Sequence, residues 1–95
     1  MFKIESPKIL DLEPKDIKEC SDNFLENYYF TKQNINLCSE MNISSCKFEN
    51  VVFNEAVYNN LSFDDVIFVN CDLSSIKFVN SSFYRVQFST SVIFY

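Results

Sequence analysis

Large apolar residues recur at every fifth position through the second half of the chain. All eleven members of the series are large and apolar, and they are Ile43, Phe48, Phe53, Tyr58, Phe63, Phe68, Leu73, Phe78, Phe83, Phe88 and Ile93. A second position, two residues before each member, is apolar in nine of eleven cases: Met41, Cys46, Val51, Ala56, Leu61, Val66, Cys71, Ile76, Ser81, Val86 and Ser91. A helix repeats near 3.6 residues and a flat strand repeats at 2, so neither element alone produces this pattern.

The five-residue period predicts a coil with a square cross-section. Each unit places two inward residues two apart, as in a strand, and then skips three, so the backbone must turn a corner. Four such sides make one circuit of twenty residues, and residues twenty apart should therefore stack. The predicted core ladders are Phe48 with Phe68 and Phe88, Ile43 with Phe63 and Phe83, Phe53 with Leu73 and Ile93, and Tyr58 with Phe78. Outward or corner ladders are predicted for Asn50 with Asn70 and for Asn60 with Asn80.

The main alternative is a set of ordinary strands in a β-sandwich. That fold favours turn signals every 8–12 residues, and this sequence has few of them and contains no glycine. The periodic coil is therefore the preferred interpretation.

The periodic stretch resembles the pentapeptide-repeat family. Its units read CKFEN, VVFNE, AVYNN, LSFDD, VIFVN, CDLSS, IKFVN, SSFYR and VQFST. The resemblance covers residues 41–95 and, more loosely, residues 28–40, and it implies an all-β, right-handed quadrilateral parallel β-helix. Two departures stand out, because the usual Ala at the small position occurs only at Ala56 and the usual central Leu is mostly Phe.

The N-terminal third does not follow this period. Residues 1–27 are expected to form an arm and cap, and residues 28–95 the β-helix, regular from residue 41. A short helix that begins near Pro14 would place four apolar residues on one face, namely Ile17, Cys20, Phe24 and Tyr28. The alternative is an irregular cap without a full helix.

The first coil, over residues 28–40, is expected to be irregular. The five-residue spacing there has a different phase, so three extra residues near Leu37 to Glu40 would have to be looped out or form a wider corner.

The net charge is −5, from 8 basic and 13 acidic residues. This balance disfavours direct nucleic-acid binding, which needs Lys and Arg to displace counterions. There is no secretory leader pattern and no apolar run near the ~20 residues of a membrane span, so we expect a cytoplasmic protein that does not bind membranes.

The four cysteines show no CxxC spacing, and the chain has no histidine. His-containing zinc sites are thereby excluded. Cys46 and Cys71 fall on inward positions, so buried reduced thiols are the preferred interpretation, while a disulfide or a metal site stays open as the alternative.

No catalytic constellation is visible. Without histidine there is no ready general base near neutral pH, and without glycine there is no phosphate-binding loop, so we expect no enzyme activity and no cofactor. The carboxylate pair Asp64-Asp65 can be a cation site or a solvated corner, and the corner is the better interpretation.

The sequence therefore favours a non-enzymatic protein-interaction or structural module with an unknown protein partner. The family resemblance implies an alternative, a DNA-mimicking modulator of a type II topoisomerase of the gyrase and quinolone-protection type. The acidic residues available for mimicry are Glu40, Glu49, Glu55, Asp64, Asp65 and Asp72, and they are interrupted by Lys47, Lys77 and Arg85.

The sequence closes on SVIFY without a recognisable capping unit. Repeat folds need covered ends, so we expect either a homodimer through the C-terminal coil or a longer solenoid of which this chain is a part. Phe94 and Tyr95 are the predicted interface residues.

Overall fold

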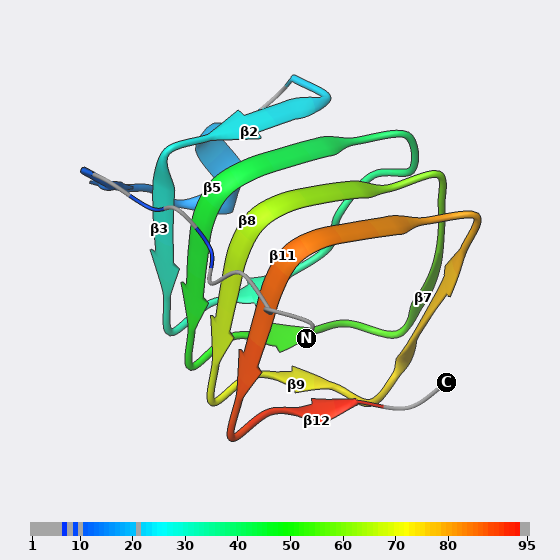
Figure 1. The fold of residues 1–95 in the computed structure, drawn as a ribbon. Helices are drawn as coiled ribbons and strands as arrows, with labels where there is room; N and C mark the ends of the chain where they lie inside the picture. The colour runs from blue at the N-terminus through cyan, green and yellow to red at the C-terminus, as the bar shows by residue number, and fades with distance from the viewer. Residues whose placement is uncertain (1–6, 8, 10, 21, 94–95) are drawn as a thin grey trace, which may run out of the picture.

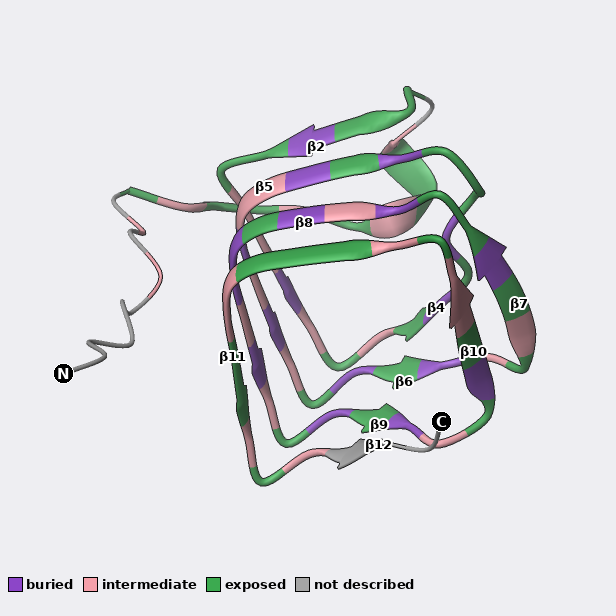
Figure 2. Ribbon diagram, turned by 45° about the vertical axis from the view of Figure 1, so that its right-hand side comes forward, coloured by how far each residue is buried: buried purple, intermediate pink, exposed green. Residues whose placement is uncertain are grey.

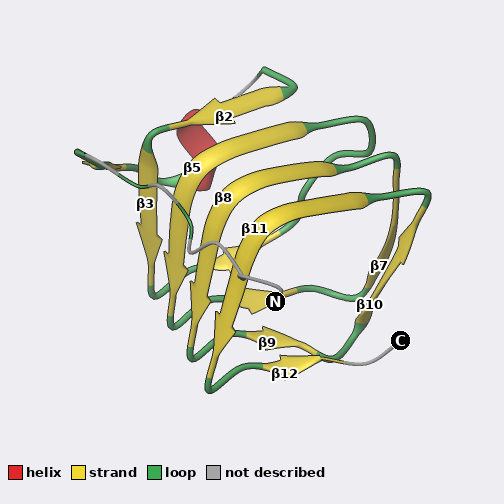
Figure 3. Cartoon of the chain, viewed as in Figure 1, coloured by secondary structure: helices red, strands yellow, loops and turns green. Residues whose placement is uncertain are grey.

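The computed structural model describes residues 7, 9, 11–20 and 22–93, which form a parallel β-solenoid (Figure 1). Apart from one short helical turn, their regular structure is made of strands (Figure 3). The strands are β1 (Glu13–Pro14), β2 (Phe24–Glu26), β3 (Tyr28–Thr31), β4 (Asn34–Ile35), β5 (Asn42–Glu49), β6 (Val52–Phe53), β7 (Ala56–Asn59), β8 (Ser62–Val69), β9 (Asp72–Leu73), β10 (Ile76–Val79), β11 (Ser82–Ser89) and β12 (Val92–Ile93). No helix in this part of the chain is long and apolar enough to cross a membrane.

The coils stack side over side and give the solenoid four faces (Figure 1). β5, β8 and β11 each bend around a corner and supply the first two faces, where they pair in the order β5-β8-β11. β5 also pairs with β2 and β3 of the first coil. The third face has the strand order β4-β6-β9-β12, and among the described residues the fourth face contains β7 and β10 alone. Every strand pair is parallel. The prediction of an all-β, right-handed quadrilateral β-helix is confirmed.

The inward side chains form columns along the bore. Phe48, Phe68 and Phe88 lie in one column, with ring centroids 5.2 and 4.9 Å apart and ring planes within 10° of parallel. Phe63 and Phe83 stack in a second column at 5.0 Å. Such close stacking follows from the backbone register, which pairs residues twenty apart in β5, β8 and β11.

The other two columns are less regular. Tyr58 and Phe78 are in register, but their rings are tilted by 44° at 6.1 Å. The backbone of Ile93 pairs with that of Leu73, whereas the Ile93 side chain and residues Phe94 and Tyr95 lie outside the described residues. Among the described residues, every coil except the last contains buried residues (Figure 2).

The first coil is irregular, as expected, but for a different reason from the one predicted. Phe30 pairs with Phe48 and Ile35 with Phe53, an offset of eighteen residues in both cases. The coil is therefore two residues shorter than the others, and the predicted loop of three extra residues near Leu37 is wrong. Figure 1 shows the segment after β4 running diagonally to β5, while later coils extend to the far corner.

Strand pairing with the second coil begins before residue 28. Leu25 of β2 pairs with Ile43 and is 1% exposed, so the first coil already contributes a core residue there. The helical face proposed for residues 17–28 is wrong, because Phe24 and Tyr28 lie in strands. A single 3-10 turn, η1 (Ile17–Glu19), remains, and Asp16 closes it in a capping box with Glu19.

The corners use the left-handed backbone conformation although the chain contains no glycine. Eleven described residues have positive φ: Asn27, Lys32, Glu40, Ser45, Asn50, Asn60, Asp65, Asn70, Asn80, Arg85 and Thr90. Asn tolerates this region better than most residues, and the Asn70 Nδ2 atom also donates to the Asn50 Oδ1 atom of the coil before it. The predicted stacking of Asn50 and Asn70 at a corner is confirmed.

Ser45 offers a direct test of these strained corners. Its φ is 51°, and a residue with a Cβ atom has a strain of about 1–2 kcal/mol in this region. Glycine removes this strain, but part of the gain is offset because glycine loses more chain entropy on folding. Ser45→Gly is therefore expected to raise the free energy of unfolding by about 0.5–1 kcal/mol. The neighbouring Ser44→Gly, in extended backbone, should lower it by about 0.5–1 kcal/mol. Urea unfolding of both variants measures the difference, and equal effects would contradict the corner assignment.

Candidate interaction surfaces

The last coil exposes aromatic rings at two positions whose counterparts in every earlier coil are buried. Phe83 is 44% exposed and Phe88 is 38% exposed, whereas Phe63 and Phe68 below them are fully buried. One face of each exposed ring stacks on the coil below, and no described residue covers the other. β10, β11 and β12 likewise have no strand on their outer side among the described residues. This last-coil end combines unpaired strand edges with apolar rings.

The opposite end of the solenoid is covered by the chain itself. Leu25, Phe30 and Ile35 of the first coil are at most 1% exposed. β1 adds to the edge of β3, and the η1 turn is fixed there because Gln33 accepts from the Ile17 amide and donates to the Lys15 carbonyl. The two ends therefore differ, and the last-coil end is the open one.

Serine replaces the small apolar residue at two inward positions of the last coil. The Ser81 hydroxyl accepts from the Leu61 amide at 3.1 Å, and the Ser91 hydroxyl accepts from the Cys71 amide at 3.1 Å. These hydroxyls satisfy backbone donors of the coil below. Among the described inward-facing residues, they leave Phe83 and Phe88 as the main exposed apolar groups of this end.

Charge is distributed unevenly along the axis. All 13 acidic residues precede Leu73, and the basic residues after it are Lys77 and Arg85. Arg85 is already paired with the coil below, because its guanidinium makes two contacts with the Asp65 carboxylate, at 2.6 and 2.8 Å. The last-coil end therefore presents little charge of its own.

The Asp64-Asp65 pair separates into two different environments. Asp64 is exposed on β8, whereas Asp65 is 8% exposed at the corner and binds Arg85 of the next coil. The interpretation of both residues as a solvated corner is therefore wrong for Asp65. The coil geometry explains why, since Asp65 and Arg85 stand twenty residues apart, one full circuit, and their side chains meet. The described residues contain no group of three or more His, Cys, Asp or Glu side chains that could hold a metal ion.

The remaining acidic residues proposed for DNA mimicry point in different directions. Glu49 lies on the second face, where it accepts from the Tyr29 hydroxyl and approaches Lys47 at 4.0 Å. Asp72 lies on the third face, and its pKa is lowered by hydrogen bonds from Ser74. Glu40 lies in the turn that precedes β5, and Glu55 lies in the bend that precedes β7 of the fourth face. Among the described residues, these carboxylates do not form a continuous row along one face.

The cysteines are free thiols. Cys46 and Cys71 are buried in the bore, as predicted, and burial raises the pKa of both thiols, that of Cys46 to about 11. Both thiols therefore stay protonated near neutral pH and pack as small apolar groups.

The open side of β7 was not predicted from sequence. It results from the short first coil, and the eighteen-residue offset between Phe30 and Phe48 is the signal that indicates it.

No protein-family model matches the chain, and no curated protein matches it either.

Proposed function

We propose that this chain is a non-enzymatic protein-interaction module of the pentapeptide-repeat type, and that its last-coil end is the binding surface. The observation that carries the proposal is the exposure of Phe83 and Phe88 at one end of a bore that is otherwise closed. Exposed apolar patches next to unpaired strand edges are typical of protein interfaces. The bound protein would cover the rings and pair with the free edge of β11.

A second copy of the chain is the proposed partner. The core residues of the first-coil end are already buried, so a head-to-tail stack would place Phe83 and Phe88 against no exposed core side chain of that end, although β2 and β4 keep a free edge among the described residues. Two last-coil ends can meet about a two-fold axis, an arrangement that closes after two copies. No acidic residue follows Asp72 in the sequence, and Arg85 is held by Asp65, so the contact buries no unpaired acidic group.

The topoisomerase alternative has less support. Mimicry of DNA requires rows of negative charge, but the carboxylates are spread over several faces, and Asp65 and Glu49 contact basic side chains. The four free thiols favour a reducing compartment, and we therefore propose the cytoplasm.

Sedimentation equilibrium at increasing protein concentration tests the proposal. The expected species has twice the mass of the 11.2 kDa chain, and Phe83→Lys should return it to one chain mass by placing a charge at the contact. Val52→Lys is the matched control, because Val52 is 44% exposed on the third face, away from this end, and should leave the dimer intact.

Two results would overturn the self-association proposal. One is a wild-type protein that stays at one chain mass throughout the high-micromolar range. The other is a dimer that Val52→Lys disrupts and Phe83→Lys does not. Circular dichroism of each variant confirms that its fold is retained before the masses are compared.

A further inference from the structure

The short first coil leaves an open strand edge on the fourth face. The strands of the second coil on the other three faces are paired on both sides: β5 with β2, β3 and β8, and β6 with β4 and β9. β7, in contrast, pairs with β10 on the side of the third coil only. The segment from residue 36 to residue 41 passes diagonally from β4 to β5 instead of forming a strand beside β7 (Figures 1 and 2).

The backbone groups along this edge can be assigned from the hydrogen bonds. The Ala56 amide donates toward the third coil, to the Ser75 carbonyl. Asn59 faces the opposite side, where its amide donates to the Ser39 hydroxyl and its carbonyl accepts from the Glu40 amide. Since polar groups alternate along a strand, the amide and carbonyl of Val57 point to the open side. No described strand pairs with them there.

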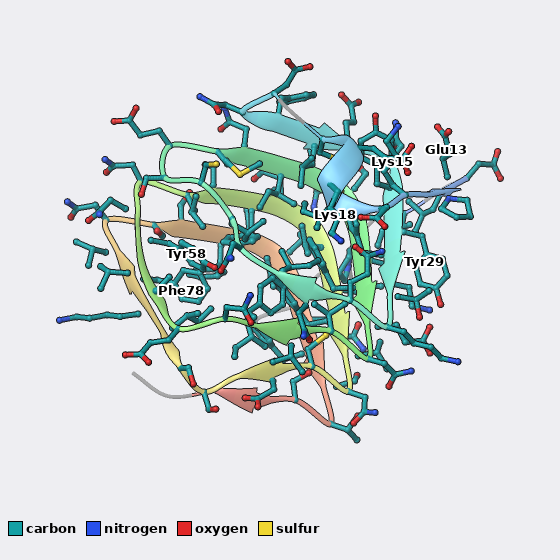
Figure 4. The ribbon with its side chains drawn as sticks, turned by 180° about the vertical axis from the view of Figure 1, so that it is seen from behind. Glu13, Lys15, Lys18, Tyr29, Tyr58 and Phe78 are labelled. Carbon is teal, nitrogen blue, oxygen red and sulfur yellow. The ribbon has the colours of Figure 1, made fainter. Side chains whose placement is uncertain are left out.

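The side chains agree with an uncovered position. Val57 is 56% exposed, and Ala56 is partly exposed although it occupies an inward position where Ile76 of the next coil is 4% exposed. Within the bore, Tyr58 lies next to Phe78 (Figure 4) and its hydroxyl accepts from the Leu37 amide. The chain thus closes the bore at Tyr58 and Asn59 but leaves the first half of β7 free.

Acidic residues flank both ends of this edge. Glu55 immediately precedes β7, and Glu40 contacts its last residue through the backbone. Both side chains are exposed, and neither forms an ion pair with a described residue. Lys77 is beside Val57 on β10, on the side away from the open edge. An added strand with basic residues at its ends would complement this arrangement.

We propose that β7 binds an extended, basic peptide segment of a partner protein by strand addition. The peptide backbone would pair with Val57, an apolar β-branched residue would pack beside its side chain, and flanking Lys or Arg residues would approach Glu40 and Glu55. This site deepens the proposed function as an interaction module, but it uses a different surface from the last-coil end.

The test titrates isotope-labelled protein with the peptide KTVTVTK, acetylated and amidated at its ends, and follows backbone amide shifts by NMR. The sequence is palindromic, so either strand direction presents the same side chains. The largest shifts are expected at Val57 and its neighbours in β7. The acidic peptide ETVTVTE should bind about tenfold more weakly at low salt, since two charge pairs change sign.

Two variants separate strand addition from general charge attraction. Val57→Pro removes the edge donor without removing a bond to β10, and it should abolish binding, whereas Val57→Thr keeps the donor and should bind as the wild type does. The double variant Glu40→Gln/Glu55→Gln should lose the preference for KTVTVTK while the fold is unchanged. This double variant keeps the test informative if the proline variant does not fold.

Three outcomes would overturn the inference. They are the absence of binding, shifts confined to β11 and β12, and self-association that Val57→Pro abolishes, which would make a second copy the occupant of this edge. Peptide binding should persist in Phe83→Lys. A wild-type protein that binds the peptide but stays at one chain mass would refute only the dimer proposal. A wild-type protein that dimerises through Phe83 but does not bind the peptide would refute only this one.

Discussion

Replacing Phe68 with alanine is expected to lower the free energy of unfolding by about 3–5 kcal/mol. Phe68 is fully buried and stacks between Phe48 and Phe88 at 5.2 and 4.9 Å. Phe53 and Phe63 also contact its ring edge-on, each at 5.8 Å. Alanine would leave a cavity in the centre of this cluster, which the stiff coil backbone cannot collapse to fill. Urea unfolding monitored by circular dichroism measures the change.

The same substitution at Phe24 is the matched control. Phe24 is 50% exposed on the outer side of β2, so Phe24→Ala removes an equal number of atoms without emptying a column. Its cost should stay below about 1 kcal/mol. If the two variants were equally destabilised, the assignment of inward and outward positions would be wrong.

The regular coils are predictable because one periodic pattern fixes several levels of structure. The five-residue spacing identifies the inward positions, and twenty residues per circuit then determine which residues stack. Phe48, Phe68 and Phe88 could therefore be placed in one column from spacing alone, and the structure has them there.

The first coil is not predictable in the same way, since the chain there has no second period against which to fix its length. Ile35 and Ile43 are eight residues apart. That spacing fits one five-residue side lengthened by three residues, or two sides that together are two residues short. Backbone pairing of Ile35 with Phe53 decides for the second. The open edge of β7, which depends on that difference, was consequently missed.

Interactions between corners also escaped the sequence, although the register needed to find them was available. Asp65 and Arg85 stand twenty residues apart at equivalent corners, so the stacking rule brings them together as it does Asn50 and Asn70. Asp65 was instead interpreted beside its neighbour Asp64, as a local carboxylate pair. In a coil of this kind, the relevant neighbour of a corner residue is the one a full circuit away.

Asp65→Asn is expected to lower the free energy of unfolding by about 1.5–3 kcal/mol, the range for a hydrogen bond to a charged group. The asparagine tolerates the positive φ of this corner, so the change removes the charge of the carboxylate and little else. The side chains of Arg85 and Asp65 are only 20% and 12% exposed, so water replaces the lost contact poorly. Asp64→Asn is the matched control one residue away, and it should leave stability almost unchanged because Asp64 is exposed. Thermal unfolding at low and high salt measures both, and if the two variants were equally stable, the contact between Asp65 and Arg85 would not stabilise the last coil.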